Sequence, residues 1–375
     1  MNPPNLFRPI SLRDLTLSNR VVVAPMCQYS AVDGVPQAWH LQHLGSFAVS
    51  GPGLVVVEAT GVEAIGRITP GCTGLYSDAC EEAFARTVDL VKRVGQAKIG
   101  IQLAHAGRKA STAAPWQGGK PLAAGDPQAW RTLGPSDVPF ADWPAPKAAD
   151  EADLARVREA FVRATHRALR AGFDLIEVHC AHGYLLHEFL SPLANRREDA
   201  YGGSLENRMR FPLEVLQAVR EAWPQNRPLG MRISATDWAE GGFTLDEAVP
   251  FVAAAKAQGV DFVCVSSGGT VPHGLPPGGP TGVAQGYQVP LADRIRRDTG
   301  MVTRAVGMIV DPHFAEATLA EGKADMVALA RGFLDDPRWV WHAADALGVP
   351  EAALVPPQYA RARPATWPGA KRRSA

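Results

Sequence analysis

The sequence predicts an α/β fold, a single (β/α)8 TIM barrel in which eight parallel strands alternate with helices around one core. Eight short apolar runs recur along the 375 residues. Their apolarity is continuous rather than alternating, which is typical of parallel strands covered on both faces. No G-x-G-x-x-G loop follows the first run, which argues against the alternative of a doubly wound open sheet. The expected strands are 20–26, 54–60, 98–105, 175–182, 229–234, 262–267, 302–307 and 326–331.

The segments between these runs have helical periodicity and helix-end signals. Several open on Ser, Thr or Asp, which cap the first turn of a helix, and close on Gly. One barrel with these helices accounts for residues 1–355, and residues 356–375 are expected to form a separate C-terminal tail. The expected helices are 77–95, 150–172, 205–223, 244–259 and 311–322.

Three segments fall outside the repeat. The stretch "ISLRDLTLSNR" (10–20) is expected to form a small N-terminal hairpin that caps the barrel floor. Residues 106–149 follow the third strand and contain seven prolines. They form a loop too long for a plain connection, so we expect it to be functional or lid-like. The tail is rich in Pro and Arg, and no regular structure is expected there.

Composition excludes several classes of function. Lys plus Arg equals Asp plus Glu at 38 each, and the basic residues are scattered apart from "AKRR" near the C-terminus. Neither nucleic acid nor a membrane surface is therefore an expected partner. The five cysteines contain no C-x-x-C, which argues against a disulfide framework and against a zinc or iron–sulfur site. With no signal peptide and no spanning segment, we expect a soluble, cytoplasmic protein.

Polar residues end the apolar runs. In barrels of this kind the active site lies at the carboxyl ends of the strands, so these side chains are expected to ring one cavity. They are Cys27, Thr60, Gln102, His105, His179, His182, Arg232, Ser234, Ser267 and Arg331.

Two glycine-bearing loops follow the last two strands. "VGMI" (306–309) and "ARGF" (330–333) occupy the place where such barrels most often bind phosphate, with backbone N–H groups and Arg331 as donors. The alternative is that Gly307 and Gly332 serve tight turns alone. The pattern favours a phosphorylated ligand.

The stretch "HCAHGYLLHEFL" (179–190) carries the most reactive groups. His179 and His182 supply two imidazole donors, Tyr184 a phenol, and Arg232 a fixed cation. Such a set suits a ligand whose carbonyl oxygen gains negative charge, with the phenol supplying a proton at carbon. The alternative is that His182 only bonds a loop and Tyr184 only packs.

Other chemistries fit these residues poorly. A metal site would need a third ligand such as Glu188 or Asp199, and H-x-x-H off a strand end lacks the helical spacing of H-E-x-x-H. A Schiff-base enzyme would need a lysine inside the barrel, whereas Lys98 begins its strand and Lys109 lies beyond one. We assign structural or surface roles to the histidines on helical segments and loops, which are His40, His43, His166, His313 and His342.

Seven stretches of the chain, in order, carry a resemblance to a known family. They are "VVVAPMCQYSA", "LVVVEAT", "IGIQLAHAGRKAS", "HCAHGYLLHEFLSPLANRREDAYGGSLENRMRF", "MRISATDW", "AVGMI" and "QYARA". In them the chain resembles the Old Yellow Enzyme family of FMN-dependent ene reductases, specifically its smaller, thermophilic-like bacterial branch. The match runs from about Leu6 to Arg361, and its most specific part is 179–211.

The resemblance implies the same barrel and FMN as the phosphorylated ligand. A cation near the N1/C2 edge of the isoalloxazine stabilises its anionic reduced form. Cys27 would tune the flavin potential, although a small buried thiol also serves packing alone. By resemblance, the ring contacts Ala24, Pro25, Met26, Cys27, Ala59, Gln102 and Arg232, and the phosphate contacts Gly307, Met308, Ala330 and Arg331. Many relatives have Gly where this chain has Ala330.

The resemblance also implies a reaction. His179 and His182 would bind the carbonyl or nitro oxygen of an activated alkene, Tyr184 would protonate Cα, and flavin N5 would deliver hydride to Cβ. Tyr29 would line the pocket. Because no dinucleotide fingerprint is visible, NADPH or NADH should reduce the flavin from the same pocket and leave first, which predicts ping-pong turnover.

In relatives of this branch the chain's end reaches a neighbouring subunit. The resemblance therefore implies a homodimer or homotetramer in which Arg361, or alternatively Trp367, enters a neighbouring active site. Related flavin enzymes with an iron–sulfur cluster have a Cys-rich segment after the barrel, and this chain has none. Two rival functions are a metal-dependent TIM-barrel hydrolase using His179 and His182, and a barrel that only binds a phosphorylated ligand.

Overall fold

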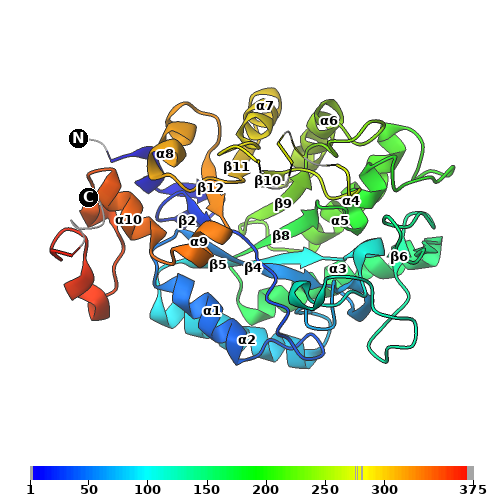
Figure 1. The fold of residues 1–375 in the computed structure, drawn as a ribbon, viewed down its shortest axis with the longest axis horizontal. Helices are drawn as coiled ribbons and strands as arrows, with labels where there is room; N and C mark the ends of the chain where they lie inside the picture. Colours follow the sequence, from blue (N-terminus) through cyan, green and yellow to red (C-terminus); the bar gives the residue numbers. More distant parts are fainter. Residues whose placement is uncertain (1–2, 275, 277, 280–281, 370–375) are drawn as a thin grey trace.

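The computed structural model describes residues 3–369 except 275, 277 and 280–281. Its centre is a closed barrel of eight parallel strands, and each strand that the sequence predicts is present (Figure 1). The strands are β3 (Val21–Val23), β4 (Leu54–Gly61), β5 (Lys98–Ala104), β8 (Leu175–Cys180), β9 (Leu229–Ser234), β10 (Phe262–Ser266), β11 (Val302–Val306) and β12 (Met326–Leu329). The predicted (β/α)8 barrel is therefore confirmed.

Strand order follows the chain, and the pairing of β12 with β3 closes the barrel. All eight strands are almost completely buried, as continuous apolarity predicts. Between β4 and β5 the register shifts at Val57 and Ala59, which marks a bulge next to the barrel mouth. Because the strands are parallel, all their carboxyl ends meet at one rim.

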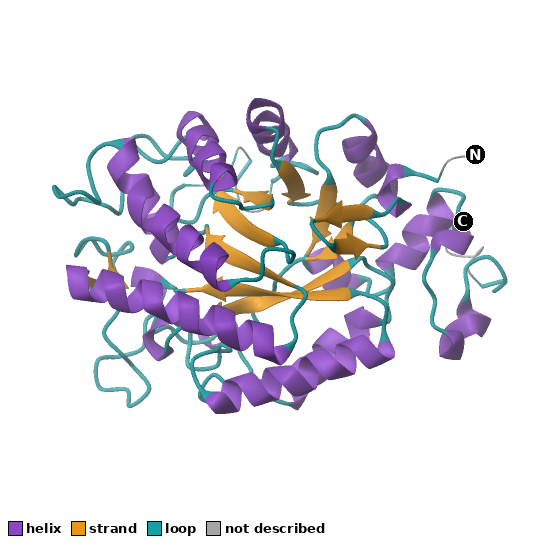
Figure 2. Cartoon of the chain, turned by 180° about the vertical axis from the view of Figure 1, so that it is seen from behind, coloured by secondary structure: helices purple, strands orange, loops and turns teal. Residues whose placement is uncertain are grey.

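Ten α-helices lie in the described part of the chain, most of them around the barrel (Figure 2). The five predicted helices are confirmed, and their caps form as expected: the side chains of Ser77 and Asp150 accept N–H bonds from the first turns of α2 and α3. The helices are α1 (Ala38–Ala48), α2 (Asp78–Val94), α3 (Glu151–Ala171), α4 (Leu185–Leu190), α5 (Leu205–Ala222), α6 (Leu245–Ala257), α7 (Val289–Thr299), α8 (Pro312–Ala320), α9 (Arg331–Asp335) and α10 (Trp339–Ala346).

Periodicity did not reveal the other five helices, α1, α4, α7, α9 and α10. Helix α1 buries two histidines, His40 and His43, on its inner face, so its core-facing side does not have an apolar pattern. The N-terminus of α1 is also unusual, because the backbone N–H of Gln37 donates to Nδ1 of His40 at 3.0 Å. None of the described helices is long and apolar enough to cross a membrane.

The predicted hairpin consists of β1 (Ile10–Leu12) and β2 (Leu15–Leu17), paired antiparallel. Leu12 and Leu17 pack with the inward-facing Leu54 and Met326 in one apolar cluster. The hairpin thus closes one end of the barrel, and the other end is left for the site.

The long loop after β5 is largely irregular. It contains two 3-10 turns, Gly107–Lys109 and Pro115–Gln117, and the two-residue strands β6 (Leu133–Gly134) and β7 (Lys147–Ala148). In Figure 1 the red C-terminal tail lies at the opposite end of the molecule from β6.

The expectation of a wholly irregular tail was wrong for Pro357–Ala362, which form a 3-10 helix. Prolines at its start favour helical φ. Its Tyr359 ring lies 6.3 Å from that of Trp341, and the Arg338 guanidinium lies over it at 5.3 Å. Residues 370–375 of the predicted tail lie outside the described residues.

Candidate active site

A tight turn at the end of β8 carries the central residues. The N–H of Tyr184 donates to the carbonyl of Ala181 at 3.2 Å, and the two residues between them have positive φ, +60° for His182 and +70° for Gly183. Two positive φ values are what a type I′ turn requires. For a histidine this conformation costs about 1–2 kcal/mol. The surroundings must therefore hold the turn in place.

Neighbouring strands and loops hold the turn through its backbone. The N–H of His182 donates to Oγ of Ser234 at 2.9 Å, and Nζ of Lys109 donates to the carbonyl of His182 at 2.8 Å. Gly183 is required by space as well as by φ, because a Cβ there would lie 2.1 Å from the carbonyl oxygen of Gly269.

The two imidazoles form a hydrogen-bonded chain. The N–H of Ala181 donates to Nδ1 of His179 at 3.1 Å, which places the proton of that ring on Nε2. This Nε2 lies 3.3 Å from Nδ1 of His182. Nε2 of His182 lies 2.8 Å from Oγ of Ser266, and Ser266 in turn donates to Oε1 of Gln288 at 3.2 Å. Each imidazole thus has one protonated nitrogen and is a donor.

Electrostatics keeps both rings neutral. Burial, followed by the Arg232 guanidinium, lowers the pKa of both His179 and His182 well below the ordinary value. At neutral pH the rings are therefore N–H donors without a charge. Such donors stabilise a growing negative charge on a ligand oxygen.

Tyr184 stands beside these rings. Its ring centre is 5.0 Å from that of His179 and 6.5 Å from that of His182. Burial raises the pKa of the phenol well above its ordinary value, although Arg232 opposes this. The phenol keeps its proton at neutral pH, as a proton donor must.

A cavity of about 310 Å³ adjoins the turn. It is lined by His182, Arg232 and the loops after β11 and β12, so the predicted phosphate residues lie together. A Cβ at Gly307 would lie 2.6 Å from the Gln288 side chain, so this position admits only glycine without rearrangement. The lining includes Ser266, Ser267, Tyr287, Gln288, Gly307, Met308, Ala330 and Arg331.

The donor set fits a phosphorylated, oxygen-rich ring system. Nε of Arg232 is buried without a partner among the described residues, and an unsatisfied buried donor calls for an acceptor. Arg331 adds a second cation to the lining of the cavity. Sequence reasoning missed Tyr287 and Gln288, because they precede a helix that was not predicted.

The segment after β3 lies beside β4. Ala24 is buried, and Pro25 and Met26 are half-buried. The hydrogen bond with the Cys72 thiol, followed by burial, raises the pKa of the Cys27 thiol well above its ordinary value. The Ala59 N–H, which the thiol accepts, opposes this by lowering the pKa.

The amide of Gln102 is partly occupied inside the barrel. Its Nε2 donates to Oε1 of Glu177 at 2.6 Å, and Glu177 forms a fully buried ion pair with Arg304. Of the ten polar side chains expected to ring one cavity, four line it and six do not. His182, Arg232, Ser267 and Arg331 line it, whereas Cys27, Thr60, Gln102, His105, His179 and Ser234 do not. Thr60 contacts Thr73, and Nε2 of His105 lies 2.9 Å from Oε1 of Glu63.

Tyr29 lines a second hollow of about 640 Å³, together with the long loop. Its ring meets Trp116 edge-on at 5.6 Å. Arg361 is exposed on the tail and lines neither of these hollows. Within one chain, the structure therefore does not bring Arg361 to the site.

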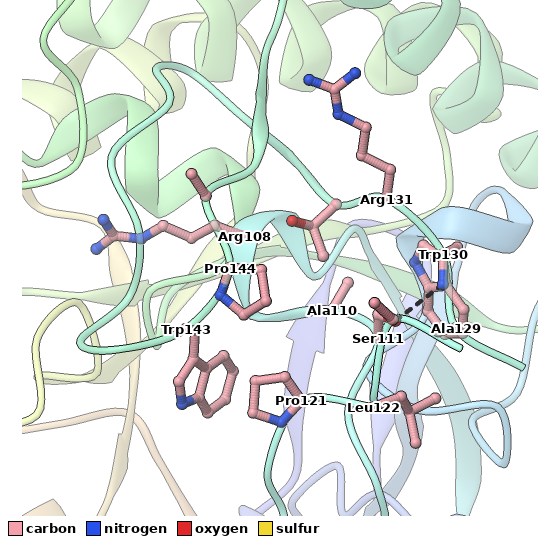
Figure 3. A pocket seen from close by; sticks show the side chains of 13 residues that line it. Arg108, Ala110, Ser111, Pro121, Leu122, Ala129, Trp130, Arg131, Trp143 and Pro144 are labelled. Atoms are coloured by element: carbon pink, nitrogen blue, oxygen red, sulfur yellow. Dashed lines mark hydrogen bonds between the residues drawn. The ribbon is translucent and has the colours of Figure 1, made fainter. Parts of the chain in front are cut away.

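A third hollow, of about 310 Å³, lies within the long loop (Figure 3). Trp143 and Pro144 stand on one side and Trp130 on the other, and the N–H of Trp130 donates to Oγ of Ser111 at 3.0 Å. The Arg108 guanidinium points away from the labelled rings. Trp130 also lines the hollow that contains Tyr29, so the two hollows are neighbours.

The sequence profile of the NADH:flavin oxidoreductase / NADH oxidase family matches residues 5–348. The chain belongs to this family. It is 45% identical to an NADPH dehydrogenase of Geobacillus thermodenitrificans over 359 residues, 95% of this chain and 98% of that protein. It is 42% identical to an NADPH dehydrogenase of Listeria innocua over 360 residues, with the same coverage.

Solved structures agree with the family. The chain superposes on morphinone reductase with a TM-score of 0.75 at 28% identity, covering 92% of this chain and 90% of that one. The Old Yellow Enzyme resemblance is thereby confirmed, as are FMN as cofactor and a nicotinamide as reductant. The metal-dependent hydrolase gains no support, and no three His, Cys, Asp or Glu side chains among the described residues gather to hold a metal ion.

Proposed function

We propose that this FMN-dependent NAD(P)H oxidoreductase reduces activated alkenes, namely α,β-unsaturated carbonyl compounds and nitroalkenes. The observation that carries the proposal is the grouping of two neutral imidazole donors, His179 and His182, with a protonated phenol, Tyr184. When bound, FMN would supply the two-electron redox chemistry that links oxidation of NAD(P)H to reduction of the alkene.

Two groups of the chain would hold FMN. Gly307, Met308, Ala330 and Arg331 would bind its phosphate, while Arg232 and Gln102 would face the ring with Ala24, Pro25, Met26, Cys27 and Ala59. The orphaned Nε of Arg232 supports this placement. One pocket would serve nicotinamide and alkene in turn, which gives ping-pong kinetics.

The imidazoles and the phenol have separate tasks in the proposed reaction. The substrate oxygen would replace Ser266 as acceptor of the His182 Nε2–H bond, and His179 would stay on the donor side of the chain. Negative charge on that oxygen then grows against neutral donors, which lowers the barrier rather than only the binding energy. Tyr184 would donate its proton to Cα, and Tyr29 would bound the pocket.

Tyr184→Phe tests the proposal. General acid groups contribute about 10²–10⁴-fold, so the anaerobic return of flavin colour with 2-cyclohexenone should slow by about a hundredfold. Bleaching by NADPH should stay within about twofold, since it needs no phenol proton. Tyr201→Phe, at a phenol that contacts Glu214 away from the site, is the matched control. Equal loss in both half-reactions would reject the proton-donor role.

The oligomeric state is part of the proposal. Arg361 is exposed and available to a neighbouring chain, and Trp367 is the alternative. Sedimentation of the whole enzyme should show a dimer or tetramer. Arg361→Ala should raise the KM for the alkene if this residue enters the partner's site. An unchanged KM together with a monomeric enzyme would reject the proposed oligomer and the role of Arg361.

A further inference from the structure

A buried pair of side chains lies beneath the turn that carries His182 and Tyr184. His187 on α4 and Asp237 in the loop after β9 have no exposed side-chain surface, and Nε2 of His187 lies 3.2 Å from Oδ1 of Asp237. Nε2 of His187 makes no hydrogen bond to any described residue, so its contact with Asp237 is mainly electrostatic. Neither residue lines the hollows described above.

Asp237 is anchored on every side. Its Oδ1 accepts the Thr270 hydroxyl at 2.7 Å, and its Oδ2 accepts the Ser191 hydroxyl at 2.6 Å and the Phe243 N–H at 2.7 Å. Burial works to raise the pKa of Asp237, but His187 and these hydroxyls lower it to about 2. The carboxylate is therefore a fixed negative charge.

The turn fixes the tautomer of His187. The N–H of Gly183 donates to Nδ1 of His187 at 2.9 Å, and the Thr270 hydroxyl oxygen lies 3.2 Å from the same nitrogen. Because a backbone N–H can only donate, Nδ1 carries no proton and the ring proton is on Nε2, facing Asp237. A carboxylate that orients an imidazole whose other nitrogen does the work is a recurring arrangement in protein sites. In this protein the other nitrogen, Nδ1 of His187, accepts the hydrogen bond from the Gly183 N–H.

That N–H follows directly on a strained residue of the site. His182 has a φ of +60°, and the turn's other backbone anchors are Ser234 and Lys109. Gly183 lies between His182 and Tyr184, so loss of its acceptor moves the backbone on which both side chains stand. A misplacement of about 1 Å costs about a hundredfold in rate.

We propose that His187 and Asp237 are positioning residues that hold the 181–184 turn for the reaction. This inference rests on the proposed roles of His182 and Tyr184. Asp237 orients the His187 ring, and the ring accepts the Gly183 N–H. The turn thereby keeps the His182 imidazole and the Tyr184 phenol in their positions relative to each other. Neither residue exchanges a proton with substrate.

Two near-isosteric variants separate the tasks of His187. In His187→Asn an amide oxygen replaces Nδ1, so the acceptor for Gly183 is kept. In His187→Gln an amide nitrogen takes the place of Nε2, so the donor toward Asp237 is kept and the acceptor is lost. With the FMN-loaded enzyme, the Gln variant should lower kcat for 2-cyclohexenone at least about tenfold with little change in KM, and the Asn variant less than about threefold.

A second readout does not depend on activity. Two-bond ¹H–¹⁵N spectra of the imidazoles should show the Nε2–H tautomer of His187 in the wild-type enzyme and a mixture in Asp237→Asn. His43→Asn, at a buried imidazole that packs against Phe47 on α1, is the control and should leave both the rates and the His187 signals unchanged.

Several results would overturn the inference. They are wild-type rates in His187→Gln, equal losses in the Asn and Gln variants, or a proton on Nδ1 of His187 in the wild type. The last result decides the matter even if a variant fails to fold. Failure of the proposed function is a separate outcome, seen as unchanged alkene reduction in Tyr184→Phe.

Discussion

Lys109 Nζ donates a hydrogen bond to the carbonyl of His182 at 2.8 Å while lying 5.3 Å from the ring centre of Tyr184. It also donates to the carbonyl of Gly269 at 2.9 Å. Lys109→Met removes both bonds at similar volume, and each bond from a charged group is worth about 1.5–3 kcal/mol. We expect alkene reduction to slow about tenfold, measured by anaerobic stopped flow.

The control for this change is Lys120→Met, at an exposed lysine of the same loop, which should leave both half-reactions unchanged. Burial lowers the pKa of Lys109 to about 8. The ammonium is therefore lost as pH rises through 8, and the wild-type rate of alkene reduction should approach that of Lys109→Met above this pH. A rate ratio that stays constant up to pH 10 would contradict this assignment.

Gly183→Ala should be far more damaging than Gly203→Ala. Both glycines have positive φ, +70° and +79°, so each alanine bears the same backbone strain of about 1–2 kcal/mol. Only at Gly183 does the added Cβ meet another atom, the carbonyl oxygen of Gly269 at 2.1 Å, whereas Gly203 has open space. Urea unfolding should show a larger loss in the free energy of unfolding for Gly183→Ala than for Gly203→Ala. Equal losses would mean that the backbone of the turn shifts to accommodate the added Cβ at no cost.

Glu188 predicts a pH-dependent stability. It is completely buried, its Oε1 accepts the Arg108 N–H at 2.9 Å, and burial raises its pKa from 4.5 to about 8. Between these values the folded state binds the proton and the unfolded state does not, so this contribution is complete below pH 4.5 and is lost as pH rises through 8.

Glu188→Gln removes that titration. The free energy of unfolding of the wild type relative to this variant should fall from pH 5 to pH 8, by at most about 1.4 kcal/mol per unit. Urea unfolding at successive pH values measures the difference. A flat difference would show that Glu188 is already ionised in the folded protein at pH 5.

The Glu177–Arg304 pair in the barrel interior predicts strong coupling. Both side chains are completely buried, so Arg304→Met leaves an uncompensated carboxylate, and breaking such a pair costs about 3–5 kcal/mol. The double variant Glu177→Gln/Arg304→Met should recover most of this loss. Guanidinium unfolding of the single and double variants measures the coupling, and additive losses would show that the two charges act independently.

Much of the barrel follows from local pattern. Each strand is a continuous apolar run because it is buried on both faces, and the caps at Ser77 and Asp150 are local as well. Parallel strands then bring His179, Arg232 and Arg331 to one rim without further information. The sequence pattern did not predict helix α1, because the buried face of this helix includes histidines.

The partners of the site residues were not predictable in the same way. Gln288 reaches Ser266 from an irregular segment, Cys72 meets Cys27, and Asp237 meets His187. Each pair joins residues far apart in the chain that carry no local pattern. Tertiary packing alone decides these contacts, and they set the tautomers and pKa values on which the chemistry depends.

The contacts from His179 through His182 to Ser266 form one continuous chain. A ligand gains binding energy from this chain only if it has an oxygen that accepts the His182 N–H hydrogen bond more strongly than the Ser266 hydroxyl does. An unactivated hydrocarbon alkene has no such oxygen, so the hydrogen bond between His182 and Ser266 stays intact. In the proposed reaction, the enzyme thus selects alkenes that carry a strong hydrogen-bond acceptor oxygen before any hydride is transferred.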